Sequence, residues 1–123
     1  MTALLHFVSP PPGFEPHTEF ALDPVDGAEG LFTLDAVDDA ALRLFVLDPS
    51  LVIADYSPVI SDEQVAELGL AAPADALLLV VAGRSAEGAQ VNLLAPIVAD
   101  ATTGRAAQVI LDGQDYPLRA ALG

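Results

Sequence analysis

"QVNLLAPIVADATTGRAAQVIL", residues 90–111, is the stretch that decides the fold of this chain. It contains two apolar runs, residues 90–100 and 106–111, with the turn sequence "ATTG" between them. Short apolar runs that alternate with turn residues are typical of antiparallel strands. Pro96 interrupts the first run, and because proline cannot donate to a strand ladder, it belongs at a sheet edge or a β-bulge.

Asn92 and Pro96 leave two interpretations of this run open. In the first, Pro96 marks a bend at the corner of a barrel and the Asn92 amide, opposite Val91 and Leu93, is simply solvated. In the second, the strand is a bulged edge whose free backbone groups let a partner segment add to the sheet.

The rest of the chain repeats the same pattern of short apolar runs and turns. Turn-rich sequences such as "DPVDGAEG" and "DAVDDAA" separate these runs. The further strands are expected at residues 4–8, 19–22, 31–34, 42–47, 51–56 and 76–83. No crossover helix long enough for an α/β fold fits between them, so the sequence predicts one all-β domain, a small antiparallel barrel or sandwich.

One short helix is expected at residues 62–68. Ser61 is a good N-cap residue, and Gln64, three residues later, completes a capping box. Gly69 follows where a left-handed C-cap would stand. The helix is therefore two turns at most.

The charge balance excludes several classes of partner. The net charge is −14, from 18 acidic residues against four arginines and no lysine. A nucleic-acid binder or a protein that docks on anionic membranes needs a cationic surface, so neither class fits. The acidity either serves solubility or steers the protein toward a basic partner.

The remaining composition describes a chain with a genuine core. Hydrophobic residues make up 53% and mean hydropathy is +0.50, which argues against disorder. Cysteine is absent, which excludes disulfides and thiolate sites. The start "MTALLHFVSP" lacks the features of a signal peptide and residues 76–82 are too few to cross a bilayer, so we expect a cytoplasmic protein.

No catalytic constellation emerges from the sequence. His6 and His17 are the two histidines, and neither stands in a Ser-His-Asp order. Acidic residues cluster at Asp23/Asp26/Glu29, Asp35/Asp38/Asp39 and Asp112/Asp115. These clusters lack the ligand ladder of a calcium loop, so solvated turns explain them better than weak metal binding. We therefore expect no enzyme activity and no cofactor, with a small metal-dependent hydrolase built on the Asp clusters as the alternative.

At "NLLAPIVAD…GRAAQVIL" the chain resembles the FliW family, the flagellar assembly factors. The resemblance continues in the right order through "LLHF…PPGFE" (residues 4–15), "LFVLDPSLVIADY" (residues 44–56), and Tyr116 with Arg119. It spans nearly the whole of residues 1–123 and implies a single small antiparallel β-barrel-like domain without enzymatic activity.

The resemblance also implies a mechanism of partner exchange. Family members bind flagellin in the cytoplasm and also bind CsrA, a dimeric RNA-binding repressor of flagellin translation. When flagellin is secreted, the released assembly factor captures CsrA and translation resumes. We expect this chain to be monomeric alone, with Asp48, Pro49, Asn92, Ala95 and Pro96 on the partner-binding surface and Phe14 and Tyr116 as structural anchors.

The chain departs from the family pattern in three places. Only Met1, Thr2 and Ala3 precede the Leu-His-Phe segment where the family has an extra strand or hairpin, so we expect a missing N-terminal strand and a barrel open on one side. Asp48-Pro49 replaces the family's Asn-Pro, and Pro10 replaces a glycine. The first two changes leave a degenerate flagellin-binding chaperone without a CsrA partner as a further alternative.

Overall fold

The computed structural model describes residues 3–11, 14–39, 41–51, 56, 58, 61–69, 76–85, 88–100, 102–111, 116–117 and 120–121. Within these residues the strands are β1 (Ala3–Phe7), β2 (Glu19–Pro24), β3 (Leu31–Ala36), β4 (Arg43–Leu47), β5 (Ala76–Ser85), β6 (Gly88–Asp100), β7 (Arg105–Gln108) and β8 (Ala120–Ala121). The helical segments are a short 3₁₀ turn, η1 (Pro49–Leu51), and one α-helix, α1 (Asp62–Leu68). The expected all-β fold with one short helix is confirmed.

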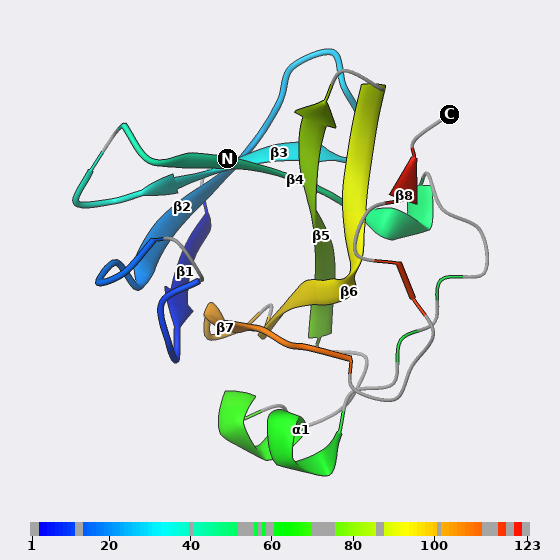
Figure 1. Ribbon diagram of the computed structural model, residues 1–123. Helices are drawn as coiled ribbons and strands as arrows, with labels where there is room; N and C mark the ends of the chain where they lie inside the picture. Colours follow the sequence, from blue (N-terminus) through cyan, green and yellow to red (C-terminus); the bar gives the residue numbers. More distant parts are fainter. Residues whose placement is uncertain are drawn as a thin grey trace.

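The strands form a closed barrel (Figure 1). Neighbouring strands pair in the order β5-β4-β3-β2-β1-β7-β6, and β6 pairs back with β5 to complete the ring. The short strand β8 adds to β6 outside this ring. Every pairing in the ring is antiparallel except β1 with β7, which is parallel.

The parallel pair β1–β7 is what closes the barrel. His6 lies opposite Arg105 and Phe7 opposite Ala106. The His6 N–H donates to the Gly104 carbonyl at 2.7 Å, immediately before β7 begins. The expectation of a barrel open on one side was therefore wrong, because β1 finds its second neighbour in β7.

The barrel interior holds the main hydrophobic core. Alternate residues of each strand point inward, as the two-residue period of a strand requires. Phe7 and Phe20 meet edge to face with ring centroids 5.4 Å apart. The buried members of this core are Leu5, Phe7, Phe20, Leu22, Leu34, Ala36, Val46, Leu79, Ile97, Ala99 and Ala106.

Two smaller clusters cover the outer face of β5 and β6. In the first, Leu68 of α1 packs with Val98, Val109 and Leu111. In the second, the side chains of Tyr56 and Tyr116 lie against a cluster formed by Leu47, Val80, Val91 and Leu93. Because both faces of β5 are covered, its sequence is an unbroken apolar run rather than an alternating one.

Helix α1 has the caps that its sequence predicts. The Ser61 hydroxyl accepts from the Gln64 N–H at 3.1 Å, and the Gln64 side chain accepts from the Ser61 N–H at 2.9 Å. Gly69 ends the helix in the left-handed conformation, with φ +69°. The prediction of a helix at residues 62–68 is confirmed.

One expected strand, at residues 51–56, falls largely outside the described residues. Leu51 ends η1 and Tyr56 belongs to no strand. The acidic pair Asp112 and Asp115, together with Arg119, also lies outside the described part of the chain.

Candidate functional site

Strand β6 kinks in its middle, at the residues singled out by the sequence. Leu79 of β5 lies opposite Ile97, whereas Val81 lies opposite Asn92. An advance of two residues along β5 therefore corresponds to five residues along β6. The extra residues form an irregular bulge that contains Pro96. The prediction of a bulge is confirmed, but β6 is no edge strand, because it pairs with β5 on one side and with β7 and β8 on the other.

The backbone of the kink has no free hydrogen-bonding group between residues 93 and 96. The Leu93 N–H donates to the Pro117 carbonyl at 3.2 Å, and the Tyr56 hydroxyl donates to the Leu93 carbonyl at 2.7 Å. The carbonyls of Leu94 and Pro96 accept from the N–H groups of Leu111 and Val109, each at 2.9 Å. The N–H groups of Leu94 and Ala95 and the Ala95 carbonyl are bound by side-chain amides.

Strand addition at Pro96, the second of the interpretations above, is therefore wrong. A partner strand needs unpaired N–H and C=O groups on the strand that it joins. At this kink the protein itself occupies all of them, and Pro96 is fully buried.

Asn92 holds the kink from its N-terminal side. Its Oδ1 atom accepts from the Leu94 N–H at 3.0 Å and from the Ala95 N–H at 3.1 Å. This is the local side-chain-to-backbone bonding that favours asparagine in turns. Asn92 is half-buried and structural on one side of its amide, rather than simply solvated.

Gln108 holds the kink from the neighbouring strand, a role that the sequence did not indicate. Its Nε2 atom donates to the Ala95 carbonyl at 3.0 Å. The two residues are 13 positions apart. No local pattern connects them, and only the pairing of β6 with β7 brings them together.

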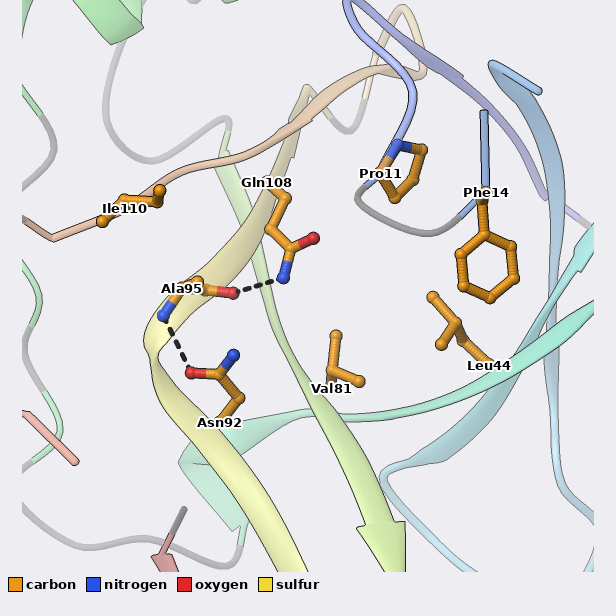
Figure 2. Close-up of a pocket in the computed structure, with 8 residues that line it drawn as sticks. All are labelled: Pro11, Phe14, Leu44, Val81, Asn92, Ala95, Gln108 and Ile110. Carbon is orange, nitrogen blue, oxygen red and sulfur yellow. Dashed lines mark hydrogen bonds between the residues drawn. The ribbon is translucent and has the colours of Figure 1, made fainter. Parts of the chain in front are cut away.

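A cavity of about 270 Å³ opens beside the kink (Figure 2). It lies between the loop after β1, strands β4 and β5, the kink of β6, and the end of β7. Its lining residues are Pro11, Phe14, Leu44, Val81, Asn92, Ala95, Gln108 and Ile110. None of them is acidic, basic or a histidine, so this wall offers contacts for binding but no group for acid–base catalysis.

Tyr56 stabilises the outer side of the kink. Its ring meets that of Tyr116 edge to face, with centroids 4.8 Å apart. Burial beside Leu93, and to a lesser extent the proximity of Tyr116, raises the pKa of Tyr56 to about 12. The hydroxyl therefore stays protonated, and able to donate to the Leu93 carbonyl, well above neutral pH.

The structure places Asp48 and Pro49 in a different turn from the kink. The Asp48 carboxylate accepts from the Ser50 N–H at 3.0 Å and the Ser50 hydroxyl at 2.7 Å, which caps η1. The backbone N–H of Asp48 donates to the Gly30 carbonyl at 2.8 Å. Pro49 is buried, and neither residue lines the cavity.

Of the two expected anchors, Phe14 lies at the cavity and Tyr116 at the outer face. The rings of Phe14 and Phe20 meet edge to face with their centroids 6.0 Å apart, and Phe14 forms part of the cavity wall. The structure thus brings together Phe14, Asn92 and Ala95 at the cavity, with Pro96 buried in the kink.

The described residues contain no group of three or more His, Asp or Glu side chains that could hold a metal ion. His6 is exposed and lies 3.6 Å from Glu19. Within the same residues, no helix is long and apolar enough to span a bilayer. Of the three acidic clusters that the sequence singles out, the two that the structure describes therefore form no metal site, and Asp112 and Asp115 lie outside the described residues.

Comparisons with known proteins agree with this fold. The family model described as FliW protein matches residues 1–122. The flagellar assembly factor FliW of Azoarcus sp. (strain BH72) is 33% identical, covering 94% of this chain and 86% of the relative. That of Thermotoga neapolitana is 35% identical, covering 88% and 74%.

A solved structure supports the same assignment at the level of the fold. The crystal structure of the flagellar assembly factor FliW superposes with a TM-score of 0.87 at 24% identity, covering 95% of this chain and 83% of that chain. Together with the family match over residues 1–122, this shows that the chain belongs to the FliW family of flagellar assembly factors.

Proposed function

We propose that this protein is a cytoplasmic flagellar assembly factor that binds flagellin and, when flagellin is secreted, captures the translational repressor CsrA. The two complexes exclude each other, so the supply of flagellin feeds back on its own synthesis. The observation that carries the proposal is the family match over residues 1–122. The partners are those that the FliW resemblance implies.

The charge of the chain supports the CsrA half of the proposal. A repressor that binds RNA presents a basic surface to phosphates. A protein of net charge −14 attracts such a surface and repels the RNA itself. Capture of the repressor by a strongly acidic protein thus competes with RNA on electrostatic terms.

For the partner surface we propose two separate features of the barrel. The first is the cavity at the kink, where Asn92 and Ala95 make the contacts and buried Pro96 positions them. The second is the η1 turn, where Asp48 is half-buried and Pro49 sets the turn. Asp48 accepts through one carboxylate oxygen, as the amide oxygen of an asparagine would. Aspartate in place of the family's asparagine therefore preserves the cap of η1 and adds a negative charge.

Calorimetric titration with flagellin from the same organism tests the proposal. We expect a one-to-one complex with sub-micromolar affinity. Adding CsrA from that organism as competitor then tests the exchange: CsrA should bind the free protein and should fail to bind its flagellin complex.

The results separate the family alternatives. Flagellin binding without CsrA binding would reduce the protein to a flagellin-binding chaperone. If the folded protein bound neither partner, the proposed function would be wrong and the FliW resemblance would concern the fold alone.

A further inference from the structure

Each of the two amides at the kink uses one half of its hydrogen-bonding capacity to hold the backbone. Asn92 accepts from two N–H groups, which fixes its Oδ1 atom toward the kink. Gln108 donates to the Ala95 carbonyl, which fixes its Nε2 atom there. The orientation of both amides follows from the chemistry of their partners, because the reverse orientation would set donor against donor or acceptor against acceptor.

The other half of each amide faces the cavity (Figure 2). Among the residues that the structure describes, Asn92 Nδ2 and Gln108 Oε1 have no hydrogen-bond partner, and no buried side-chain nitrogen or oxygen lacks one. Both atoms are therefore accessible. The kink thus presents one fixed donor and one fixed acceptor on the same cavity wall.

The rest of that wall is apolar and uncharged. Phe14, Leu44 and Val81 form its inner part, and Ile110, 61% exposed, stands at its rim. A volume of about 270 Å³ lies just under the range of about 300–1,000 Å³ that small-molecule pockets occupy. The space suits one apolar side chain better than a cofactor.

We propose that this cavity is a peptide-docking site for an extended, uncharged segment of the protein partner. One apolar side chain of that segment enters the cavity. Asn92 Nδ2 donates to a carbonyl of its backbone, and Gln108 Oε1 accepts from one of its N–H groups. The inference rests on the proposed function only in taking flagellin as the source of the segment.

A peptide is the ligand that matches this wall. A peptide group carries an acceptor and a donor together, whereas a phosphate or a carboxylate carries acceptors alone and is repelled by the net charge of −14. Because the kink's own backbone is fully bonded, the two side-chain amides are the groups left to recognise a partner backbone here.

Two variants test the site without removing the bonds that hold the kink. Asn92→Asp keeps the oxygen that accepts from Leu94 and Ala95 but replaces the free donor by an acceptor. Ala95→Leu fills the cavity. The matched controls are Gln64→Glu, which adds the same charge while keeping the oxygen that caps Ser61, and Val37→Leu, which enlarges an exposed side chain away from the cavity.

Calorimetry with flagellin gives the first readout, with thermal unfolding to show that each variant is folded. We expect both variants to weaken binding at least about tenfold. Asn92→Asp sets an acceptor against the carbonyl of the partner, and Ala95→Leu occupies the space that its apolar side chain would enter. The two controls should change affinity less than about twofold. Equal affinity of wild type, Asn92→Asp and Ala95→Leu would overturn the docking site while leaving flagellin binding intact.

A second probe decides the matter if flagellin does not bind at all. The blocked amino acid N-acetyl-leucine methylamide carries one apolar side chain between two peptide groups. At about 10 mM, enough to reveal millimolar binding, it should shift the side-chain amide signals of Asn92 and Gln108 in a ¹H–¹⁵N NMR spectrum. No shift, or an equal shift in Ala95→Leu, would overturn the inference independently of the proposed function.

Discussion

The side-chain amides of Asn92 and Gln108 each have two roles. One polar atom of each amide stabilises the fold, and the other faces the cavity. The half that bonds Leu94, Ala95 or the Ala95 carbonyl is part of the barrel. The half that faces the cavity does nothing for the barrel in the described structure. Truncation to alanine would remove both halves at once, which is why isosteric changes are needed to separate stability from binding.

Tyr56 carries a prediction about pH. Its pKa is raised from 10.0 to about 12 in the folded protein, so its contribution to stability is complete below pH 10 and is lost as pH rises from about 10 through about 12. Tyr56→Phe should cost about 1 kcal/mol near pH 8, because the Leu93 carbonyl loses its donor. That difference from wild type should shrink across the alkaline window, as measured by urea unfolding at a series of pH values.

The composition of the chain leaves few other side chains that titrate in this pH range. The chain has no lysine and no cysteine, so tyrosine is the type of side chain whose ordinary pKa lies in that window. Tyr116→Phe serves as the control. An alkaline loss of stability that persists unchanged in Tyr56→Phe would contradict the assignment to Tyr56.

At this scale the sequence predicted residues whose effects are local. The caps of α1 are formed by residues only a few positions apart, Ser61, Gln64 and Gly69. Pro96 indicates a bulge because it has no backbone N–H to donate to a neighbouring strand. Gln108 and Tyr56 were missed as partners of the kink. They lie 13 and 37 positions from their acceptors, and only the folded barrel brings them there.

Among the elements, β6 is the strand that connects the clusters of the molecule. Its N-terminal part pairs with β8 and its C-terminal part with β7, and the kink lies between the two. Both parts pair with β5. The bulge lies at the point where β6 changes partner on that side, from β8 to β7.

The turn between β6 and β7 yields a prediction about barrel closure. Gly104 has φ +80°, and a Cβ atom there would collide with the carbonyl oxygen of Leu4 in β1. Gly104→Ala should therefore destabilise the fold by about 2–4 kcal/mol, from backbone strain and from displacement of β1. Urea unfolding measures the change.

Gly27 provides the matched control for Gly104. Its φ is +79°, but a Cβ atom there would meet nothing within 4 Å. Gly27→Ala should carry the backbone strain alone, about 1 kcal/mol. Equal costs at the two positions would show that contact with β1 is not what restricts Gly104.

Element types were easier to predict than element partners. Turn residues and apolar runs indicated most of the strands, and α1 was predicted over the range observed. The parallel pairing of β1 with β7 has no local signature, since it depends on how the sheet curls round. For that reason the expectation of an open barrel failed although the strands themselves were right.

For the whole molecule, charge is the dominant surface property. With a net charge of −14, the folded state concentrates like charges that the unfolded chain spreads out. Raising NaCl from about 10 to 300 mM shortens the Debye length from about 30 Å to under 8 Å and should stabilise the protein by about 1 kcal/mol, or several degrees in Tm. Thermal unfolding at constant pH measures this.

The shape of the salt dependence identifies its cause. Screening should act mostly below a few hundred millimolar and then level off, whereas surface exclusion of salt grows steadily with concentration. A Tm that is flat at low salt would mean that the acidic residues are too far apart to repel one another appreciably.

The parallel pairing of β1 with β7 also determines when the barrel can close during synthesis of the chain. His6 and its partner Arg105 are separated by about 100 residues, so one of the first strands translated waits for one of the last. At about 5–20 residues per second, several seconds pass between completion of β4 and the arrival of β7. Throughout that interval β1 has an unpaired edge, and a chain that stalls before Gly104 keeps it. The edge of β1 is thus sealed only when residues 105–108 have been made, so an open edge on β1 marks a chain that has not yet reached β7.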